Sequence, residues 1–363
     1  MDAAVSRAAE ILNAARYPLV YGLSSLTCEA QRAAVALADR VGACLDIVAS
    51  PAAALLPDLG TVSCTLGEVK NRADLVVFWG GRAHEKYSRL ASDIALDVTG
   101  RFVPDGGRGR MVIVVGDRTT AIAFAADDLH LPMTPGEDFA ALWLLRALVQ
   151  GRAVEPTAGP VAGVSFADWR ALAEHFKACK FGVLFLDLAP PTGRRAAEAA
   201  HGLATDLNAF TRFYAVPLPT PGNGVGAAQV LTWQTGYPAA VGLHAGYPRS
   251  FAGEYGAARV LTRGEADAAL LVGAGGLAEL PPPARDHLRR IPIVALSPRV
   301  ASLPTPAAVA VTTSACANSG GGTAFRLDGL ALPLRPATSP SFPDDFQVLQ
   351  RIENSLRRTT APG

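Results

Sequence analysis

Cysteine and histidine side chains carry most metal and redox chemistry in proteins, and here the spacing of both argues against such chemistry. The chain of 363 residues has five cysteines, and no two of them form a C-x-x-C pair. This spacing argues against a structural zinc site, a disulfide framework and an iron–sulfur cluster. We therefore interpret the thiols as buried and inert. They are Cys28, Cys44, Cys64, Cys179 and Cys316.

The six histidines are scattered, with no pair at metal-ligand spacing. His84 and His244 stand in turn-like or glycine-rich contexts near the ends of predicted strands, where open α/β sheets bind ligands. The Walker phosphate-binding pattern, the nucleophile elbow and the H-E-x-x-H pattern are absent from the sequence. The sequence therefore provides no metal ligand set and no activated nucleophile.

Two glycine-rich runs can bring backbone close to a ligand or to a neighbouring chain segment. Gly222 to Gly226 lacks the G-x-G-x-x-G spacing and follows proline-rich turns, so it gives weak support to dinucleotide binding. The second run is Ser319 to Gly322. Leu231 to Pro238 and Gly246 to Arg249 hold two aromatic-proline turns with an amide and a lone arginine. We expect these turns to line a groove or to contact another chain.

The elements that must position these residues alternate between apolar β-branched runs and helical patterns, as in a parallel sheet covered by helices. The sequence predicts strands at residues 17–22, 44–48, 74–80, 111–116, 129–131, 181–187, 210–216, 267–273, 291–296 and 307–312. It predicts helices at residues 29–41, 138–150, 165–180, 193–208 and 344–356, and an extended segment at residues 323–334. The helix at residues 138–150 is apolar almost all round, so we expect it to be buried.

The predicted strands recur in the same order. DLVVFWG at residues 74–80 resembles DAALLVG at residues 267–273, and MVIVVG resembles IPIVAL. Residues 307–312 then take the place of the short strand at residues 129–131. We interpret this pattern as an internal repeat that gives two similar α/β lobes.

Charge is sparse and balanced. Lys plus Arg is 33 and Asp plus Glu is 32, which argues against a nucleic-acid partner. Only 18% of residues are charged, against a usual share of roughly a quarter. Such a chain should be compact or hide part of its surface against a partner. No apolar stretch approaches the roughly 18 residues of a membrane span, and Met1 to Arg7 does not resemble a secretory signal. We expect a cytoplasmic protein.

Four long segments resemble the B subunit of formylmethanofuran dehydrogenase, in the molybdopterin oxidoreductase superfamily. They are YGLSSLTCEAQ (Tyr21 to Gln31), CTLGEVKNRADLVVFWG (Cys64 to Gly80), QVLTWQTGYP (Gln229 to Pro238) and GGTAFRLDGLALPLR (Gly321 to Arg335). The resemblance covers almost the whole chain. It implies an α/β fold of two interleaved, doubly wound lobes with mostly parallel sheets. Residues 1–50 and 216–363 would form a discontinuous lobe, and residues 51–215 an inserted lobe.

Two departures from the family pattern bear on function. Members that act as dehydrogenases begin with a cysteine-rich segment for a [4Fe–4S] cluster, whereas this sequence begins at Met1 with no such segment. They also carry a Cys-His-Gly-Pro run whose cysteine ligates the metal, and here the run is Val48-Ala49-Ser50-Pro51. A valine cannot ligate molybdenum or tungsten, because these metals need a soft thiolate or selenolate.

We therefore predict that the molybdopterin and the iron–sulfur cluster are lost. In this interpretation the chain has no catalytic residue, no cofactor and no metal ligand, with Val48 standing where the metal-ligating cysteine is expected. The candidates for a vestigial groove are Gly222, Gly224, Gln234, Tyr237 and Arg249.

A chain with this sequence but without the redox parts resembles the equivalent subunit of the bacterial formyltransferase/hydrolase complex. By resemblance, that complex acts in the one-carbon metabolism of methylotrophs. It passes formyl groups from formyl-tetrahydromethanopterin to a methanofuran-like carrier and hydrolyses them to formate. Its chemistry would belong to partner subunits, an amidohydrolase-like one with metals and a formyltransferase. The predicted function of this chain is that of a non-redox, structural subunit.

Two alternatives stay open. The chain could be a working molybdopterin or tungstopterin subunit of formylmethanofuran dehydrogenase whose metal ligands come from elsewhere. It could instead be a binding module that keeps the groove for a carrier, such as the polyglutamyl tail of a methanofuran analogue. In that case Arg249, Arg259 and Arg263 would pair with carboxylates.

Overall fold

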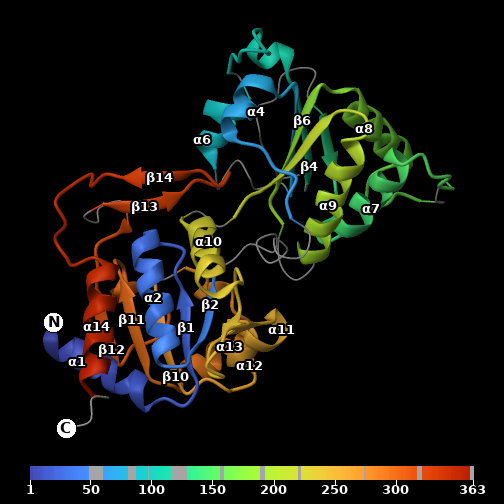
Figure 1. Cartoon of the computed structure of the whole chain (residues 1–363). Coiled ribbons are helices and arrows are strands. Elements are labelled where there is room, and N and C mark those ends of the chain that lie inside the picture. The colour runs from blue at the N-terminus through green and yellow to red at the C-terminus, as the bar shows by residue number, and fades with distance from the viewer. Residues whose placement is uncertain are drawn as a thin grey trace. The chain divides into compact units, whose positions relative to one another are not determined.

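The computed structural model describes residues 1–48, 60–80, 87–96, 98–116, 129–155, 159–188, 193–219, 222–273, 275–316 and 321–359. The chain forms two compact units (Figure 1). Unit 1 comprises Met1–Ala49 and Gly222–Gly363, and unit 2 comprises Ser50–Pro221. The sequence analysis placed the second boundary at residue 216, inside β7 (Arg212–Pro217), whereas the structure keeps that strand whole in unit 2.

Unit 1 is built on a seven-stranded sheet. In spatial order its strands are β12 (Val309–Thr312), β11 (Ile293–Ser297), β10 (Ala268–Val272), β1 (Pro18–Gly22), β2 (Cys44–Ile47), β8 (Val241–Gly242) and β9 (Arg249–Ser250). The first five strands are parallel, and β8 and β9 extend the sheet by antiparallel pairing. β1 and β10 are buried along their whole length, as expected for apolar strands covered on both faces.

Helices cover both faces of this sheet. The first face is covered by α1 (Asp2–Ala14), α2 (Cys28–Arg40), α10 (Gly224–Thr235) and α14 (Asp345–Thr359). The second face is covered by α11 (Ala252–Tyr255), α12 (Ala257–Thr262) and α13 (Pro282–Leu288). Along β1, Val20 packs with the first set and its neighbour Leu19 with the second. The alternation of side chains along a strand therefore separates the two cores.

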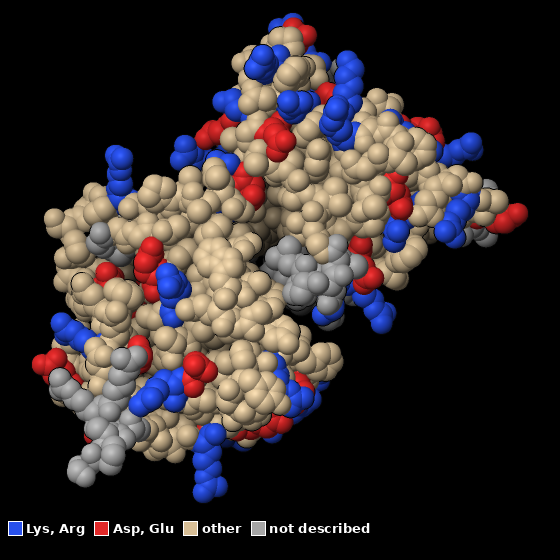
Figure 2. Space-filling model, viewed as in Figure 1, with Lys and Arg blue, Asp and Glu red and all other residues tan. Residues whose placement is uncertain are grey.

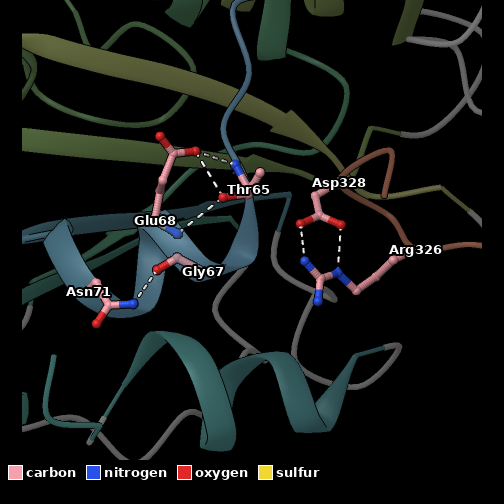
Figure 3. A network of polar contacts seen from close by, with 6 residues as sticks. All are labelled: Thr65, Gly67, Glu68, Asn71, Arg326 and Asp328. Atoms are coloured by element: carbon pink, nitrogen blue, oxygen red, sulfur yellow. Dashed lines mark hydrogen bonds and ion pairs between the residues drawn. The ribbon is translucent and has the colours of Figure 1, made fainter. Parts of the chain in front are cut away.

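Unit 2 is built on a parallel five-stranded sheet. Its order is β5 (Leu129–Pro132), β4 (Met111–Gly116), β3 (Leu75–Trp79), β6 (Phe181–Leu186) and β7. Its longer helices are α4 (Leu66–Arg72), α7 (Asp138–Val149), α8 (Phe166–Ala178) and α9 (Gly193–Leu207). α4 begins with a capping box in which Thr65 Oγ1 accepts the Glu68 N–H and Glu68 Oε2 accepts the Thr65 N–H (Figure 3).

The sheet orders of the two units correspond. In unit 2 the order β5-β4-β3-β6-β7 is the 3-2-1-4-5 arrangement of a doubly wound sheet. In unit 1 the order β12-β11-β10-β1-β2 is the same when β10 is aligned with β3 and β1 with β6. The predicted internal repeat is therefore confirmed, since DLVVFWG and DAALLVG form β3 and β10.

A separate antiparallel hairpin belongs to unit 1 and consists of β13 (Gly322–Phe325) and β14 (Ala331–Leu334). The backbone N–H and the hydroxyl of Thr323 both donate to the Glu29 carboxylate on α2, each at 2.9 Å. An ion pair between Arg326 and Asp328, at 2.6 Å, lies in the turn between the two strands (Figure 3). Two-stranded hairpins are marginally stable alone, so contacts with the rest of unit 1, such as those of Thr323 with Glu29, help to hold it.

Two expectations about helices were wrong. α7 is not fully buried, because Phe139 and Trp143 are exposed on its outer side, Trp143 by 47%. The Arg146 guanidinium lies 4.6 Å from the Trp143 ring and covers part of its face. Residues Leu231 to Thr235, which the sequence analysis grouped with an aromatic-proline turn, form the end of α10. In the described part of the chain, no helix is long and apolar enough to cross a membrane.

Candidate functional site

The carboxyl ends of β1 and β10 mark the place in unit 1 where the strand order reverses. The chain continues from β1 to β2 on one side, and from β10 to β11 on the other. Open α/β sheets bind ligands in the crevice outside such a reversal. The segment that leaves β1 here is Gly22 to Thr27, which we call the switch loop, and Gly275 and Gly276 follow β10. We take this edge of the sheet as the candidate site.

The backbone turns sharply where the switch loop begins. Gly22 has a φ of 121°, and a Cβ atom there would collide with the Val272 carbonyl group. Leu23 follows with a φ of 67°, which is uncommon for a residue other than glycine. Its side chain is fully buried, and its N–H donates to Val272 O at 3.0 Å. Packing thus holds a strained conformation, and such strain concentrates at functional sites.

A buried amide network supports the switch loop. Gln31 on α2 donates through Nε2 to the carbonyl oxygens of Leu23, Leu26 and Asn223, at 3.0, 3.3 and 3.0 Å. Asn223 donates through Nδ2 to Leu26 O at 2.8 Å and accepts the Phe325 N–H at 2.7 Å. The two amides therefore join the switch loop, the start of α10 and the hairpin. The sequence analysis singled out neither residue, because a single amide in an amphipathic helix or glycine-rich run resembles a solvated one.

Two glycines predicted for the groove lie beside the switch loop. Gly222 is exposed with a φ of 138°, and a Cβ atom there would lie 2.6 Å from Ser24 O. Gly224 is buried, and the nearest atom to a Cβ atom there would be Val48 O, at 3.6 Å. The structure therefore places Gly222 and Gly224 at the candidate site, next to Val48.

Val48 immediately follows β2 at the same edge of the sheet. Its N–H donates to Gly22 O at 3.2 Å, and its side chain is buried. A Cβ atom on Gly276 would lie 2.5 Å from Val48 Cγ2 and 2.6 Å from the Tyr21 hydroxyl. The Tyr21 hydroxyl also donates to Gly276 O at 3.4 Å. The position where the family resemblance expects a metal-binding thiolate is thus occupied by a closely packed hydrocarbon side chain.

Gln234 and Tyr237 lie away from these glycines. α10 starts at Gly224, and Gln234 is exposed on its last turn. Ten residues of α-helix separate the two by about 15 Å along the axis. Tyr237 is exposed beyond the end of the helix. The length of α10 therefore prevents these four residues from lining one small groove.

Arg249 lies at the opposite end of β2. It is exposed on β9 and pairs with Gly242, which in turn pairs with Cys44, the first residue of β2. Val48 follows the last residue of that strand. Gly222 and Gly224 therefore lie together at the candidate site, whereas Gln234, Tyr237 and Arg249 lie elsewhere in unit 1.

Of the two histidines considered for a site, His244 does not reach it. The His244 ring lies 5.3 Å from the Tyr17 ring and 5.9 Å from the Tyr255 ring, between centroids. Because Tyr17 directly precedes β1, this contact lies at the amino end of the parallel strands, away from the switch loop. His84 lies outside the described residues.

The second glycine-rich run is described only in part, since Ser319 and Gly320 lie outside the described residues. A Cβ atom on Gly322 would lie 2.8 Å from the Glu29 carboxylate. Glycine is therefore needed at position 322 so that the backbone can lie close to the Glu29 side chain of the same chain, and not because a ligand approaches it. Burial alone would raise the pKa of Glu29, but hydrogen bonds donated by Thr323 and Thr27 outweigh it and lower the pKa.

Four of the five thiols lie in surroundings that favour the protonated form. Burial raises the pKa of Cys28 and Cys44, that of Cys179 to about 12 and that of Cys316 to about 11. Cys64 is also buried, whereas Cys179 and Cys316 are half-buried. Because the thiolate is the form that binds metals, these environments disfavour metal ligation. Among the described residues, no three histidine, cysteine or acidic side chains are grouped closely enough to hold a metal ion.

The parallel sheets in 3-2-1-4-5 order, with a strained loop at the reversal, define a protein of two doubly wound α/β units. The chain belongs to the family of formylmethanofuran dehydrogenase B subunits. It is 36% identical over 346 residues to the B subunit of the tungsten-containing formylmethanofuran dehydrogenase 2 of Methanocaldococcus jannaschii. That match covers 93% of this chain and 79% of the relative.

A second relative comes from a bacterium. The chain is 35% identical over 290 residues to the Fhc B subunit of the formyltransferase/hydrolase complex of Methylorubrum extorquens, which covers 78% of this chain and 73% of the relative. It also matches the crystal structure of the formyltransferase/hydrolase complex (FhcABCD) from that organism in complex with methylofuran. The TM-score is 0.80 at 30% identity, over 99% of this chain and 96% of the matched chain. A scan against protein-family models gave no match.

Proposed function

We propose that this chain is a non-redox, structural subunit of a formyltransferase/hydrolase complex. The complex would convert formyl-tetrahydromethanopterin to formate through a methanofuran-like carrier, with the chemistry in amidohydrolase-like and formyltransferase subunits. The match to a chain of the Methylorubrum complex over nearly the full length of both chains supports this assignment. So does the identity to the B subunit of that complex.

Val48 is the observation that carries the non-redox part of the proposal. A molybdenum or tungsten centre at this edge of the sheet would need a soft ligand. The buried valine supplies none, and its methyl groups lie against Gly276. The raised pKa values of Cys28 and Cys316 add no thiolate in its place. The described residues therefore do not fit the metal, and we assign no redox step to this chain.

The molybdopterin oxidoreductase type of the fold and the loss of the iron–sulfur cluster belong to this proposal. Within these 363 residues the five cysteines are widely spaced, which does not suit a cluster that needs several neighbouring thiolates. A cytoplasmic location is likewise a prediction, which fractionation of the source cell would test.

The alternative is a catalytically active molybdopterin or tungstopterin subunit of formylmethanofuran dehydrogenase. The 36% and 34% identities to subunits of tungsten-containing enzymes favour it. It would require a metal ligand other than the residue at position 48.

Purification of the intact complex through a tag on this chain tests the proposal. We expect formyltransferase and amidohydrolase-like subunits to copurify and the complex to release formate from formyl-tetrahydromethanopterin, with no formate-dependent dye reduction. Val48→Ala should leave formate release unchanged. Stoichiometric tungsten or molybdenum together with dye reduction would overturn the proposal in favour of the alternative.

A further inference from the structure

The free edge of the unit 1 sheet exposes aromatic side chains. Among the described strands the sheet ends at β9, which pairs with β8 in the register Val241↔Ser250 and Gly242↔Arg249. Tyr247 and Phe251, which flank this short strand, are exposed by 58% and 65%. On the face of the molecule shown in Figure 2, charged side chains stand apart in broad uncharged surface. Contiguous exposed apolar surface marks contact with another protein.

Alternation along the strand gives Arg249 and Phe251 the same orientation. Phe251 is extended, with a φ of −162°, so residues two apart at this edge point to one side. Tyr247 lies in the bend that precedes this strand, two residues before Arg249. We call the surface formed by Tyr247, Arg249 and Phe251 the edge patch. Tyrosine, phenylalanine and arginine are enriched where protein interfaces are buried.

The backbone beneath the edge patch is fixed in place. Phe251 O accepts the Glu254 and Tyr255 N–H groups at 2.9 and 2.8 Å, so Phe251 caps α11. Ser250 Oγ donates to Ala239 O at 2.9 Å. Such a preformed surface loses little conformational entropy when it is buried, and the loss of that entropy is a main cost of association.

The Asp46 carboxylate holds the supporting segments together from inside the sheet. It accepts the N–H groups of Ala240 and Ala257, at 3.0 and 2.7 Å, and thereby joins the segment before β8 to the start of α12. The edge patch is therefore mounted on a backbone that is tied to β2. This gives the patch the rigidity of the sheet, although β9 itself has two residues.

Charge indicates what kind of surface covers the patch. Arg249 is exposed and forms no ion pair with any residue that the structure describes. By contrast, Arg263 pairs with Glu265 at 3.6 Å and donates to Gly253 O. Between Tyr237 and Phe251 the chain has no acidic residue. Glu254 and Arg249 both lie close enough to Tyr255 to affect its pKa, but no ion pair joins them in the described part of the chain. A carboxylate of the partner would therefore pair with the exposed Arg249 guanidinium.

We propose that the edge patch is the docking surface for a neighbouring subunit of the complex. That subunit presents apolar side chains to Tyr247 and Phe251 and a carboxylate to Arg249. This inference rests on the proposed function, because it takes its partner from the same complex. Of the two roles predicted for the aromatic-proline turns, the inference favours contact with another chain over lining a ligand groove.

Assembly of the tagged complex with paired variants tests the inference. The double variant Tyr247→Ser with Phe251→Ser, and separately Arg249→Glu, should each weaken copurification of formyltransferase or amidohydrolase-like subunits by about tenfold. The matched controls are Phe342→Ser, an aromatic exposed by 52% in the same unit, and Arg32→Glu, an exposed arginine on α2. Both controls should assemble as the unchanged chain does. Thermal unfolding of each isolated variant shows that the loss is not caused by misfolding.

The outcomes separate the two proposals. If the unchanged chain copurifies with the expected subunits and the edge variants do so equally well, the docking assignment is wrong and the proposed function stands. If the unchanged chain brings none of these subunits, the proposed function fails. If the isolated chain dimerises through the patch in sedimentation experiments, and the edge variants abolish the dimer but not the complex, a second copy is the occupant and the assignment is overturned.

Discussion

At the residue scale, the switch loop depends on amide groups whose partners are backbone carbonyls. Gln31 is fully buried, and the two hydrogens of its Nε2 are shared among three carbonyl oxygens, while its own Oε1 has no hydrogen-bond partner among the described residues. Its role is therefore to hold backbone that has left β1 in a strained conformation.

Replacement of Gln31 by leucine should destabilise unit 1. The change keeps the approximate volume but removes the hydrogen bonds from Gln31 to Leu23 O, Leu26 O and Asn223 O, each of which keeps one other donor. The expected cost is about 1–3 kcal/mol in the free energy of unfolding. Urea denaturation measures it. Gln347→Leu, at an exposed position on α14, is the control and should change the stability by less than about 0.5 kcal/mol. Equal stabilities of the two variants would show that the network contributes little.

Asp345 gives a pH-dependent prediction. Burial raises its pKa from 3.8 to about 6, and its Oδ1 has no hydrogen-bond partner within the part of the chain that the structure describes. Because the pKa is raised in the folded state, the carboxyl group favours folding below pH 3.8, and this contribution is lost as the pH rises through 6. The ionised group costs up to about 3 kcal/mol at neutral pH.

Asp345→Asn removes this cost. It also removes the favourable interaction of a carboxylate with the start of α14, which is worth about 0.3–1 kcal/mol and offsets part of the gain. The variant should therefore unfold at higher urea than the unchanged chain at about pH 7.5 and at the same urea at about pH 4. Asp344→Asn makes the same charge change at the adjacent residue, which accepts the Gln347 N–H at 2.8 Å. Because the Asp344 carboxylate also raises the pKa of Asp345, this control should stabilise the chain less than Asp345→Asn does. A stabilisation of Asp345→Asn that is equal at both pH values would contradict the assignment of its cause.

At the element scale, the hairpin of β13 and β14 is held by few contacts. Glu29 accepts two hydrogen bonds from Thr323, and the carboxylate form that accepts them is favoured by its lowered pKa. The contribution is present above pH 4.5 and is lost as the pH falls through the folded-state pKa.

Glu29→Ala should release the hairpin without unfolding the sheet. We expect amide hydrogen exchange of residues 322–334 to accelerate at neutral pH, while exchange in β1 and β10 stays slow, because local opening needs less free energy than global unfolding. Glu10→Ala removes an exposed glutamate that pairs with Arg7 and serves as the control. Unchanged exchange in the hairpin of Glu29→Ala would mean that other contacts hold it.

The elements also show what the sequence could predict. The long strands were found because continuous apolar runs such as β3 and β10 have few other interpretations, and their similarity revealed the repeat. α10 was missed because its first turn contains Gly224 and Gly226. Helix propensity disfavours glycine, and only the packing of Ala227 and Leu231 into the core selects the helix. The groove candidates were grouped wrongly in space because the length of that helix was not known.

The exposure of α7 has a related cause. An apolar sequence indicates that a helix avoids water but not what covers it, so Phe139 and Trp143 were expected in the core. The switch loop was equally hidden, because the left-handed conformation of Leu23 is imposed by tertiary contacts. Val48 differed, since only the family resemblance predicted a role for its position, and the structure added the surrounding contacts.

At the scale of the whole molecule, the chain combines 18% charged residues with a net charge of +1. Few charges give little repulsion between copies, so a chain with exposed aromatic groups tends to associate. We expect the chain to be poorly soluble when expressed alone and to be rescued by coexpressed partner subunits. The soluble fraction after centrifugation measures both conditions, and a stable monomer at high concentration would contradict the expectation.

The same measurement of the soluble fraction shows whether the edge patch or the low charge causes poor solubility. If the patch drives self-association, the double variant Tyr247→Ser with Phe251→Ser should be more soluble alone than the unchanged chain, yet gain nothing from coexpressed partners. If sparse charge is the cause, this variant should remain poorly soluble, and Phe342→Ser should be as poorly soluble as the double variant. Higher solubility together with lost assembly is the expected result, because one apolar surface would then account for both properties.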